Sequence, residues 1–99
     1  MNIYLKALTE LANECQYMKD FIEYSGDDTT EQQLVDNCGV GTSWVAMRMV
    51  PHRTTGHVRN KLNNLVKSGH VIKSKHTPGA MNLWLPVGYL QTLRDGERR

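Results

Sequence analysis

The residues best suited to binding chemistry lie between Asp36 and Asp95. No aspartate or glutamate occurs within this interval. It nevertheless holds eight lysine and arginine residues and all four histidines: Arg48, Arg53, Arg59, Lys61, Lys67, Lys73, Lys75, Arg94, His52, His57, His70 and His76. Solvated surfaces normally mix charges of both signs, because opposite charges relieve repulsion. An acid-free, base-rich stretch of this length therefore indicates a polyanionic partner, with nucleic acid as the first candidate.

The first forty residues carry the opposite charge. They hold two lysines against eight acidic residues, whereas residues 41–99 hold ten lysines and arginines against two acidic residues. The net charge of +2 thus combines −6 in the first part with +8 in the second. The alternative to a polyanionic partner is that the acidic part folds against the basic part and neutralises it. A compact fold would still leave one basic face, which we expect to be exposed.

The strongest binding candidates lie on a helix predicted from Thr54 or Thr55 to about Ser68. Its apolar face has the spacing i, i+4, i+7 and i+8 that is typical of a helix, at Val58, Leu62, Leu65 and Val66. At about 100° per residue, the opposite side carries Gly56, His57, Asn60, Asn63, Asn64 and Lys67, with Arg59 and Lys61 at its borders. Lysine and arginine neutralise phosphates, and asparagine can pair with an adenine edge. Glycine near a helix N-terminus lets a phosphate approach closely.

A hairpin is predicted after this helix. His70 to His76 alternates as a strand, Thr77 to Ala80 forms a turn around Pro-Gly, and Met81 to Leu85 returns as the paired strand. Lysines two residues apart on a strand share one face, and His76 is expected at the tip. The predicted binding residues are therefore Arg53, Thr55, Gly56, His57, Arg59, Asn60, Asn63, Lys67, Lys73 and Lys75.

Neither catalytic nor metal-binding motifs are recognisable in the sequence. It has no glycine-rich phosphate loop, nucleophile elbow or His-Glu metal motif. Cys15 and Cys38 are too few for a disulfide scaffold and fit no zinc-ligand spacing. We expect no enzymatic activity, no metal and no other cofactor. Because no apolar stretch could span a bilayer and no secretory signal is present, we expect a cytoplasmic protein without membrane contact.

The remaining elements must position the basic segment within one domain, residues 1–99. Residues 2–24 are predicted to form one long amphipathic helix with a heptad-like stripe at Tyr4, Leu8, Leu11, Cys15, Met18 and Ile22. The stripe either forms a homodimer or packs on its own domain. Residues 30–86 are expected to form the core, and residues 87–99 a short tail that is helical only to about Leu93.

Two short helices are predicted between the long helix and the basic one. The first runs from Thr30 to Asn37, with Asp28 or Thr29 as its cap. The second runs from Trp44 to Val50 after a cap at Thr42 or Ser43 and ends at Pro51. Its apolar side is expected to hold Trp44 or Val45, followed by Met47 and Met49.

This order of elements resembles a winged helix-turn-helix domain. The run His57-Val58-Arg59-Asn60-Lys61-Leu62-Asn63-Asn64-Leu65-Val66-Lys67-Ser68-Gly69-His70-Val71 is similar to the recognition helix and the start of the wing in prokaryotic winged-helix regulators. Trp84-Leu85-Pro86 resembles the strand that closes the wing, so the resemblance covers about residues 42–86. It implies a mainly helical fold with a small β-hairpin, here preceded by a long N-terminal helix. It also implies that the helix over residues 54–68 lies in the major groove while the wing contacts a neighbouring groove or the backbone.

Three functions follow as expectations. The first is sequence-specific binding of double-stranded DNA by a transcriptional regulator of a bacterium, phage or plasmid. A homodimer through residues 2–24 would read a two-fold site. The second is a winged-helix module that binds another protein, such as a phage or mobile-element protein acting on a host complex. The third is binding of RNA or of nucleic acid without sequence preference, against which the few aromatic residues of the basic face count.

Overall fold

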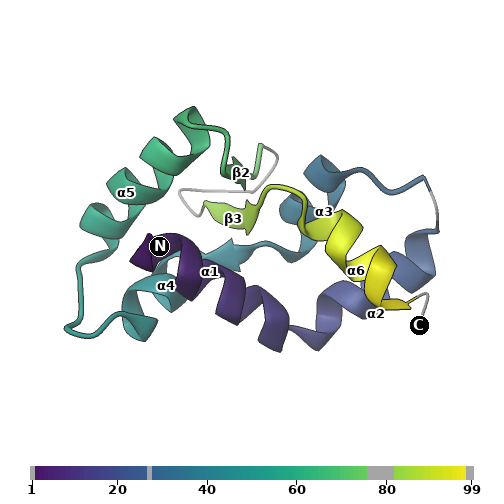
Figure 1. Cartoon of the computed structure of the whole chain (residues 1–99), viewed down its shortest axis with the longest axis horizontal. Helices are drawn as coiled ribbons and strands as arrows, with labels where there is room; N and C mark the ends of the chain where they lie inside the picture. The colour runs from purple at the N-terminus through teal and green to yellow at the C-terminus, as the bar shows by residue number, and fades with distance from the viewer. Residues whose placement is uncertain (1, 27, 76–81, 98–99) are drawn as a thin grey trace.

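Helices make up most of the described chain and surround a small antiparallel sheet. A computed structural model describes residues 2–26, 28–75 and 82–97. Within these ranges the elements are α1 (Ile3–Glu14), α2 (Gln16–Ser25), α3 (Glu31–Cys38), β1 (Val40–Gly41), α4 (Thr42–Arg48), α5 (Thr55–Lys67), β2 (Val71–Lys73), β3 (Leu83–Pro86) and α6 (Tyr89–Glu97) (Figure 1). The expected class, mainly helical with a small hairpin, is confirmed at this level. In the same ranges, no helix is long and apolar enough to cross a membrane.

The central strand of the sheet is β3, which pairs antiparallel with β1 on one side and with β2 on the other. Its Trp84 lies opposite Val40 of β1 and is fully buried. The indole N–H of Trp84 donates a hydrogen bond of 2.7 Å to Oγ1 of Thr42, the first residue of α4. The two predicted hairpin strands are thus found as β2 and β3, and β1 adds a third strand where the sequence indicated only a short extended connection.

The prediction of a single helix over residues 2–24 is wrong, because the chain bends at Cys15. This residue has an extended backbone (φ −88°, ψ 101°), so α1 ends before it and α2 begins after it. The bend lets α1 pack against α4, α5 and β3 while α2 packs against α3. Four residues of the predicted stripe are consequently buried in the core of their own chain: Tyr4, Leu8, Met18 and Ile22. A homodimer through these helices remains a prediction, and it would need their exposed residues.

The caps of α3 and α4 also differ from the expected ones. Thr30, rather than Asp28 or Thr29, caps α3: its Oγ1 accepts a hydrogen bond from the Gln33 N–H, and the Gln33 Oε1 accepts one from the Thr30 N–H. This reciprocal arrangement is a capping box. The N-cap of α4 is Gly41, which has no side chain that could form a capping hydrogen bond. Thr42, one of the two predicted caps, is instead the first residue of the helix, which ends at Arg48 and not at Val50.

The expected apolar side of α4 is only partly correct. Val45, Ala46 and the following Met49 are buried, but Trp44 is 61% exposed and Met47 is 63% exposed. Successive residues of a helix are about 100° apart. A short helix that buries its fourth and fifth residues must therefore turn the third and sixth to solvent.

The C-terminal segment is a longer helix than the predicted turn. It extends to Glu97, and Tyr89, Leu90 and Leu93 are buried in the core. The Tyr89 hydroxyl donates a hydrogen bond of 2.7 Å to Oδ1 of Asn13 on α1. Figure 1 shows α6 at the end of the molecule that holds α2 and α3, away from α5.

We expect Gly39→Ala to destabilise the fold, because an added Cβ would lie 2.7 Å from the Val35 carbonyl oxygen and 2.8 Å from Leu83 Cβ. Such overpacking costs about 1–3 kcal/mol, measurable as a lower free energy of unfolding in urea. Gly56→Ala is the matched control, since it adds a methyl group in open space inside α5. That change should leave stability equal or raise it by up to about 1 kcal/mol. Equal stabilities of Gly39→Ala and wild type would contradict the close packing of Gly39 against Val35 of α3 and Leu83 of β3.

Candidate nucleic-acid interface

The helix predicted to carry the binding residues is confirmed as α5. Thr54 is its N-cap, and the Thr54 side chain accepts a hydrogen bond of 3.2 Å from the His57 N–H. Val58 and Leu62 are fully buried and fix one side of the helix to the core. The opposite side is open to solvent and carries Gly56, Asn60, Lys61, Asn64 and Lys67.

The predicted binding residues divide into two groups by their exposure. Six are exposed: Arg53, Thr55, Gly56, Asn60, Lys67 and Lys75. Four are only half exposed: His57, Arg59, Asn63 and Lys73. The predicted wing tip, His76 with the turn Thr77–Ala80, lies outside the described residues.

Asn63 does not share the exposed side of α5 with Asn60, although the sequence places both on the polar side. The exposed row continues from Asn60 to Asn64, four residues later, whereas Asn63 turns toward β2. The i, i+4 spacing of Asn60 and Asn64 is the sequence signal for this row, because side chains four apart lie above one another on a helix.

His57 faces the first helix and not only solvent. Its Nε2 lies 2.8 Å from the Tyr4 hydroxyl of α1, and the two rings are 5.9 Å apart between centroids. Tyr4 is buried, so the contact ties the first turn of α5 to α1. His57 is half exposed, so its role as a binding residue stays a prediction, and its side chain also positions α5 on α1.

Arg59 carries a charge that nothing in the described chain neutralises. Its Nε is buried and has no hydrogen-bond partner among the described residues. The same ranges contain no carboxylate within ion-pair distance of its guanidinium. An anion supplied from outside would offset this charge, since a guanidinium binds phosphate with a rigid fork of donors.

Lys73 is held between the sheet and α5. Its Nζ lies 3.3 Å from Oδ1 of Asn63 and 5.4 Å from the centre of the Trp84 ring. Its carbonyl oxygen accepts a hydrogen bond of 3.1 Å from Nε2 of Gln32 on α3. Lys73 and Lys75 therefore differ in their surroundings, because Lys75 is exposed and only its backbone N–H is engaged, by Asp36 Oδ1.

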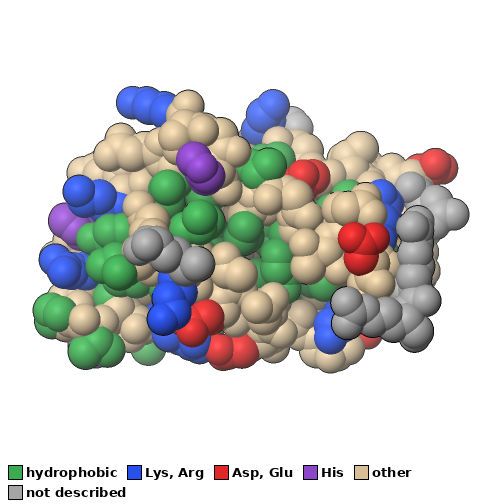
Figure 2. All heavy atoms as spheres, in the orientation of Figure 1, with side chains coloured by type: hydrophobic (Ala, Val, Ile, Leu, Met, Phe, Trp, Pro, Cys, Tyr) green, Lys and Arg blue, Asp and Glu red, His purple; other side chains and the backbone are tan. Residues whose placement is uncertain are grey.

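The charges of the surface are separated as the sequence indicates. Figure 2 shows lysine, arginine and histidine side chains over the end of this face that carries α5, with no acidic side chain there. Acidic side chains lie over the other end and along the lower edge. Among the described residues, the basic side chains of α5 have no ion-pair partner. The acidic segment therefore does not neutralise the exposed side of α5.

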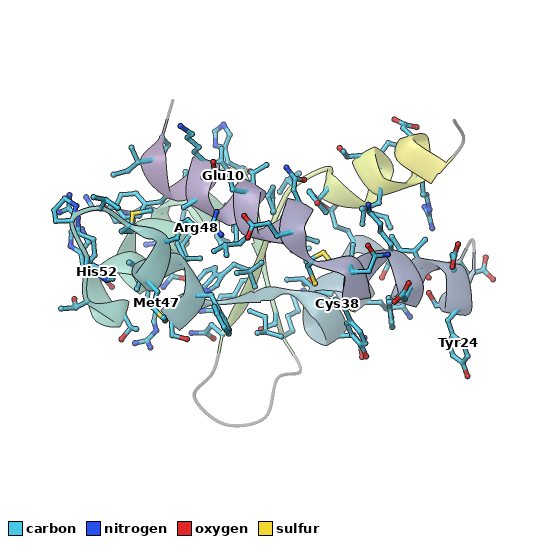
Figure 3. The ribbon with its side chains drawn as sticks, turned by 90° about the horizontal axis from the view of Figure 1, so that it is seen from below. Glu10, Tyr24, Cys38, Met47, Arg48 and His52 are labelled. Atoms are coloured by element: carbon cyan, nitrogen blue, oxygen red, sulfur yellow. The ribbon has the colours of Figure 1, made fainter. Side chains whose placement is uncertain are left out.

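The ion pair between Arg48 and Glu14 joins α4 to α1, with 2.6 Å between Nη2 and Oε1. Figure 3 shows Arg48 reaching from α4 toward α1, close to Glu10. The hydrogen bond from Arg48 lowers the pKa of Glu14, and the same bond raises the pKa of Arg48. The stabilising effect of the pair is therefore present at neutral pH and is lost as the pH falls through the lowered pKa of Glu14.

We expect Tyr4→Phe to loosen the support of α5, because it removes the hydroxyl that meets His57. The loss should lower the free energy of unfolding by about 0.5–1.5 kcal/mol, the usual net effect of one hydrogen bond. Tyr24→Phe is the control, because the Tyr24 side chain is 93% exposed at the far end of the molecule (Figure 3). Chemical denaturation of the two variants measures the difference. Identical stabilities would show that the Tyr4–His57 contact does not hold α5.

This face presents cationic and amide side chains from α5 and from the segment that contains β2. Among the described residues, no three histidine, cysteine, aspartate or glutamate side chains are grouped closely enough to hold a metal ion. No protein-family model, no curated protein and no solved structure matches the chain.

Proposed function

We propose that this chain is a winged helix-turn-helix protein that binds double-stranded DNA, with α5 in the major groove. Three features support the proposal: the order α4, turn, α5 and hairpin; the support of α5 by buried residues on one side only; and the exposed polar row on its other side. In a helix-turn-helix the second helix enters the groove while the first crosses the backbone. In this chain α5 would enter the groove, and α4 would cross the backbone.

One observation carries the proposal: the basic side chains of α5 have no acidic partner among the described residues. Lys61 and Lys67 are exposed on this helix, and Arg53 is exposed in the turn before it. Each cation that neutralises a phosphate releases condensed counterions, so affinity falls as salt rises. These side chains would supply affinity and set the position of α5, without selecting a base sequence.

Base selection would come from the exposed amides. Asn60 and Asn64 project from successive turns of α5, so they can meet neighbouring base pairs in one groove. An asparagine side chain matches the N6 and N7 edge of adenine with one acceptor and one donor. Gly56 in the first turn would allow close approach to the duplex, because an added Cβ would find nothing within 4 Å in the protein.

The proposed biological role is regulation of transcription in a bacterium, phage or plasmid. Two copies joined through exposed residues of α1 and α2 would read a site with two-fold symmetry. In that arrangement the buried apolar stripe stays within each chain.

We expect Asn60→Ala and Lys67→Ala to affect DNA binding in different ways. Asn60→Ala should relax preference at one base pair by about 1–3 kcal/mol. Lys67→Ala should weaken all sequences alike and reduce the salt slope by about one unit. Titration of selected and random duplexes over a range of salt concentrations measures both effects.

Lys19→Ala serves as the control for these variants on a duplex with a single half-site, where no contact between two copies is needed. Lys19 is exposed on α2, and this variant removes the same charge away from α5. It should bind like wild type. If both α5 variants bind selected and random duplexes as wild type does, the assignment of this face is wrong.

A second function, binding of another protein, is favoured by the exposed apolar side of α4. Trp44 and Met47 are mostly exposed, and Trp44 borders an apolar pocket of about 440 Å³ lined also by Leu11, Cys15 and Leu83. Figure 3 shows Met47 on α4 at the end of the molecule opposite Tyr24. Tryptophan and methionine are enriched in protein interfaces. In this alternative, a host protein complex would be the partner.

We expect Trp44→Ala to separate the two functions. If α4 is a protein interface, this variant should lose a host protein that co-purifies with wild type at about 150 mM salt, while duplex binding persists. Tyr17→Ala is the control, because Tyr17 is 62% exposed on α2. Gel-shift binding of duplex by wild type, without any co-purifying protein, would contradict the second function.

A further inference from the structure

Lys73 and Asn63 form a contact between the wing strand and the helix that has a consequence for base preference. Nζ of Lys73 lies 3.3 Å from Oδ1 of Asn63, and it also lies over the Trp84 ring at 5.4 Å from its centre. Trp84 is fully buried and is itself bonded to Thr42. The Lys73 side chain therefore packs on the fixed Trp84 ring, and its ammonium group contacts α5 at Asn63.

Chemistry determines which end of the Asn63 amide meets Lys73. An ammonium group has three donors and no acceptor, so only the amide oxygen can face it. The amide nitrogen, with two donor hydrogens, must then point away from Lys73. Among the described residues this nitrogen has no hydrogen-bond partner. Asn63 is half exposed, so the free donors are accessible at the edge of α5.

The same contact removes the acceptor that adenine needs. Adenine offers N7 as an acceptor and its amino group as a donor, so bidentate pairing uses both ends of an asparagine amide. The Asn63 oxygen keeps a second lone pair, but the positive charge of Lys73 disfavours the approach of another donor to it. Guanine instead offers two acceptors, N7 and O6, in the major groove.

We propose that Lys73 is a positioning residue that fixes Asn63 as a donor-only group, so that this position of α5 favours guanine over adenine. The inference rests on the proposed binding of DNA and adds the base class that one position selects. Lys73 then acts through Asn63 instead of as the phosphate contact expected from the sequence.

The test compares the duplexes selected from a randomised pool by wild type and by Lys73→Met. The methionine side chain keeps the apolar stem over Trp84 and removes the charge. The base pair that Asn63 contacts is the one whose preference relaxes in Asn63→Ala. Wild type should select guanine there, and Lys73→Met should change the guanine-to-adenine ratio by at least about fivefold toward adenine.

Lys75→Met is the matched control, because Lys75 is exposed on the same segment and its side chain has no described contact. It should weaken all duplexes without changing the preferred base. Asn63→Asp provides a second variant: it keeps an acceptor for Lys73 and removes both donors, so the guanine preference should disappear.

Two results would overturn the inference alone: adenine at the Asn63 position of wild type, or an unchanged preference in Lys73→Met with selective binding retained. A wild type that binds no duplex would instead overturn the proposed function and this inference with it. A guanine preference that moves to adenine in Lys73→Met, but not in Lys75→Met, would support the positioning role.

Discussion

The buried side chain of Trp84 is the contact on which the geometry of the candidate interface depends. Its indole N–H bonds to Thr42 at the start of α4, and its ring lies beneath Nζ of Lys73 on β2. Lys73 in turn contacts Asn63 on α5. One residue of the central strand is thus connected to both helices of the proposed helix-turn-helix and to β2. A buried donor without its acceptor costs about 1–3 kcal/mol, so the Thr42 bond fixes the indole in one orientation.

The distribution of charge follows from how the N-terminal segment packs. α1 supports α4, α5 and the sheet through its apolar side, and its acidic residues, Glu10 and Glu14, are exposed. Glu14 pairs with Arg48 on α4, which leaves Arg59, Lys61 and Lys67 of α5 without a described acidic partner. The acidic part of the sequence therefore contributes to the fold without cancelling the charge of the exposed side of α5. This separation supports the proposed polyanionic partner.

Long, regular patterns in the sequence predicted the elements that carry the candidate site. The apolar spacing of Val58, Leu62 and Leu65 gave both the extent of α5 and its buried side, because a helix of this length contains several repeats. The bend at Cys15 was not predictable in this way. Both halves of the apolar stripe face the core after the bend, so the heptad-like pattern continues through it. The exposure of Trp44 and Met47 was also missed, since seven residues contain too few repeats to define a face.

The side-chain contacts of the site could not be predicted from the periodicity of the sequence. Asn63 and Lys73 are ten residues apart, and Tyr4 and His57 are 53 apart. Each pair adds a contact that the sequence pattern does not show, since His57 supports α5 and Asn63 meets Lys73 of β2. The exposed row at Asn60 and Asn64 was within reach, because it needs only the spacing of one helical turn.

The most direct measurement of the central claim is an NMR titration of the ¹⁵N-labelled protein with duplex DNA. If α5 binds in the major groove of a duplex, the largest chemical-shift changes should occur at the backbone amides of Arg53, Asn60, Asn64 and Lys67. These changes should diminish as the salt concentration is raised. The chemical shifts of the backbone amides of α2 and α6 should not change. Shift changes centred on Trp44 and Met47, or no changes with any duplex at low salt, would contradict the account.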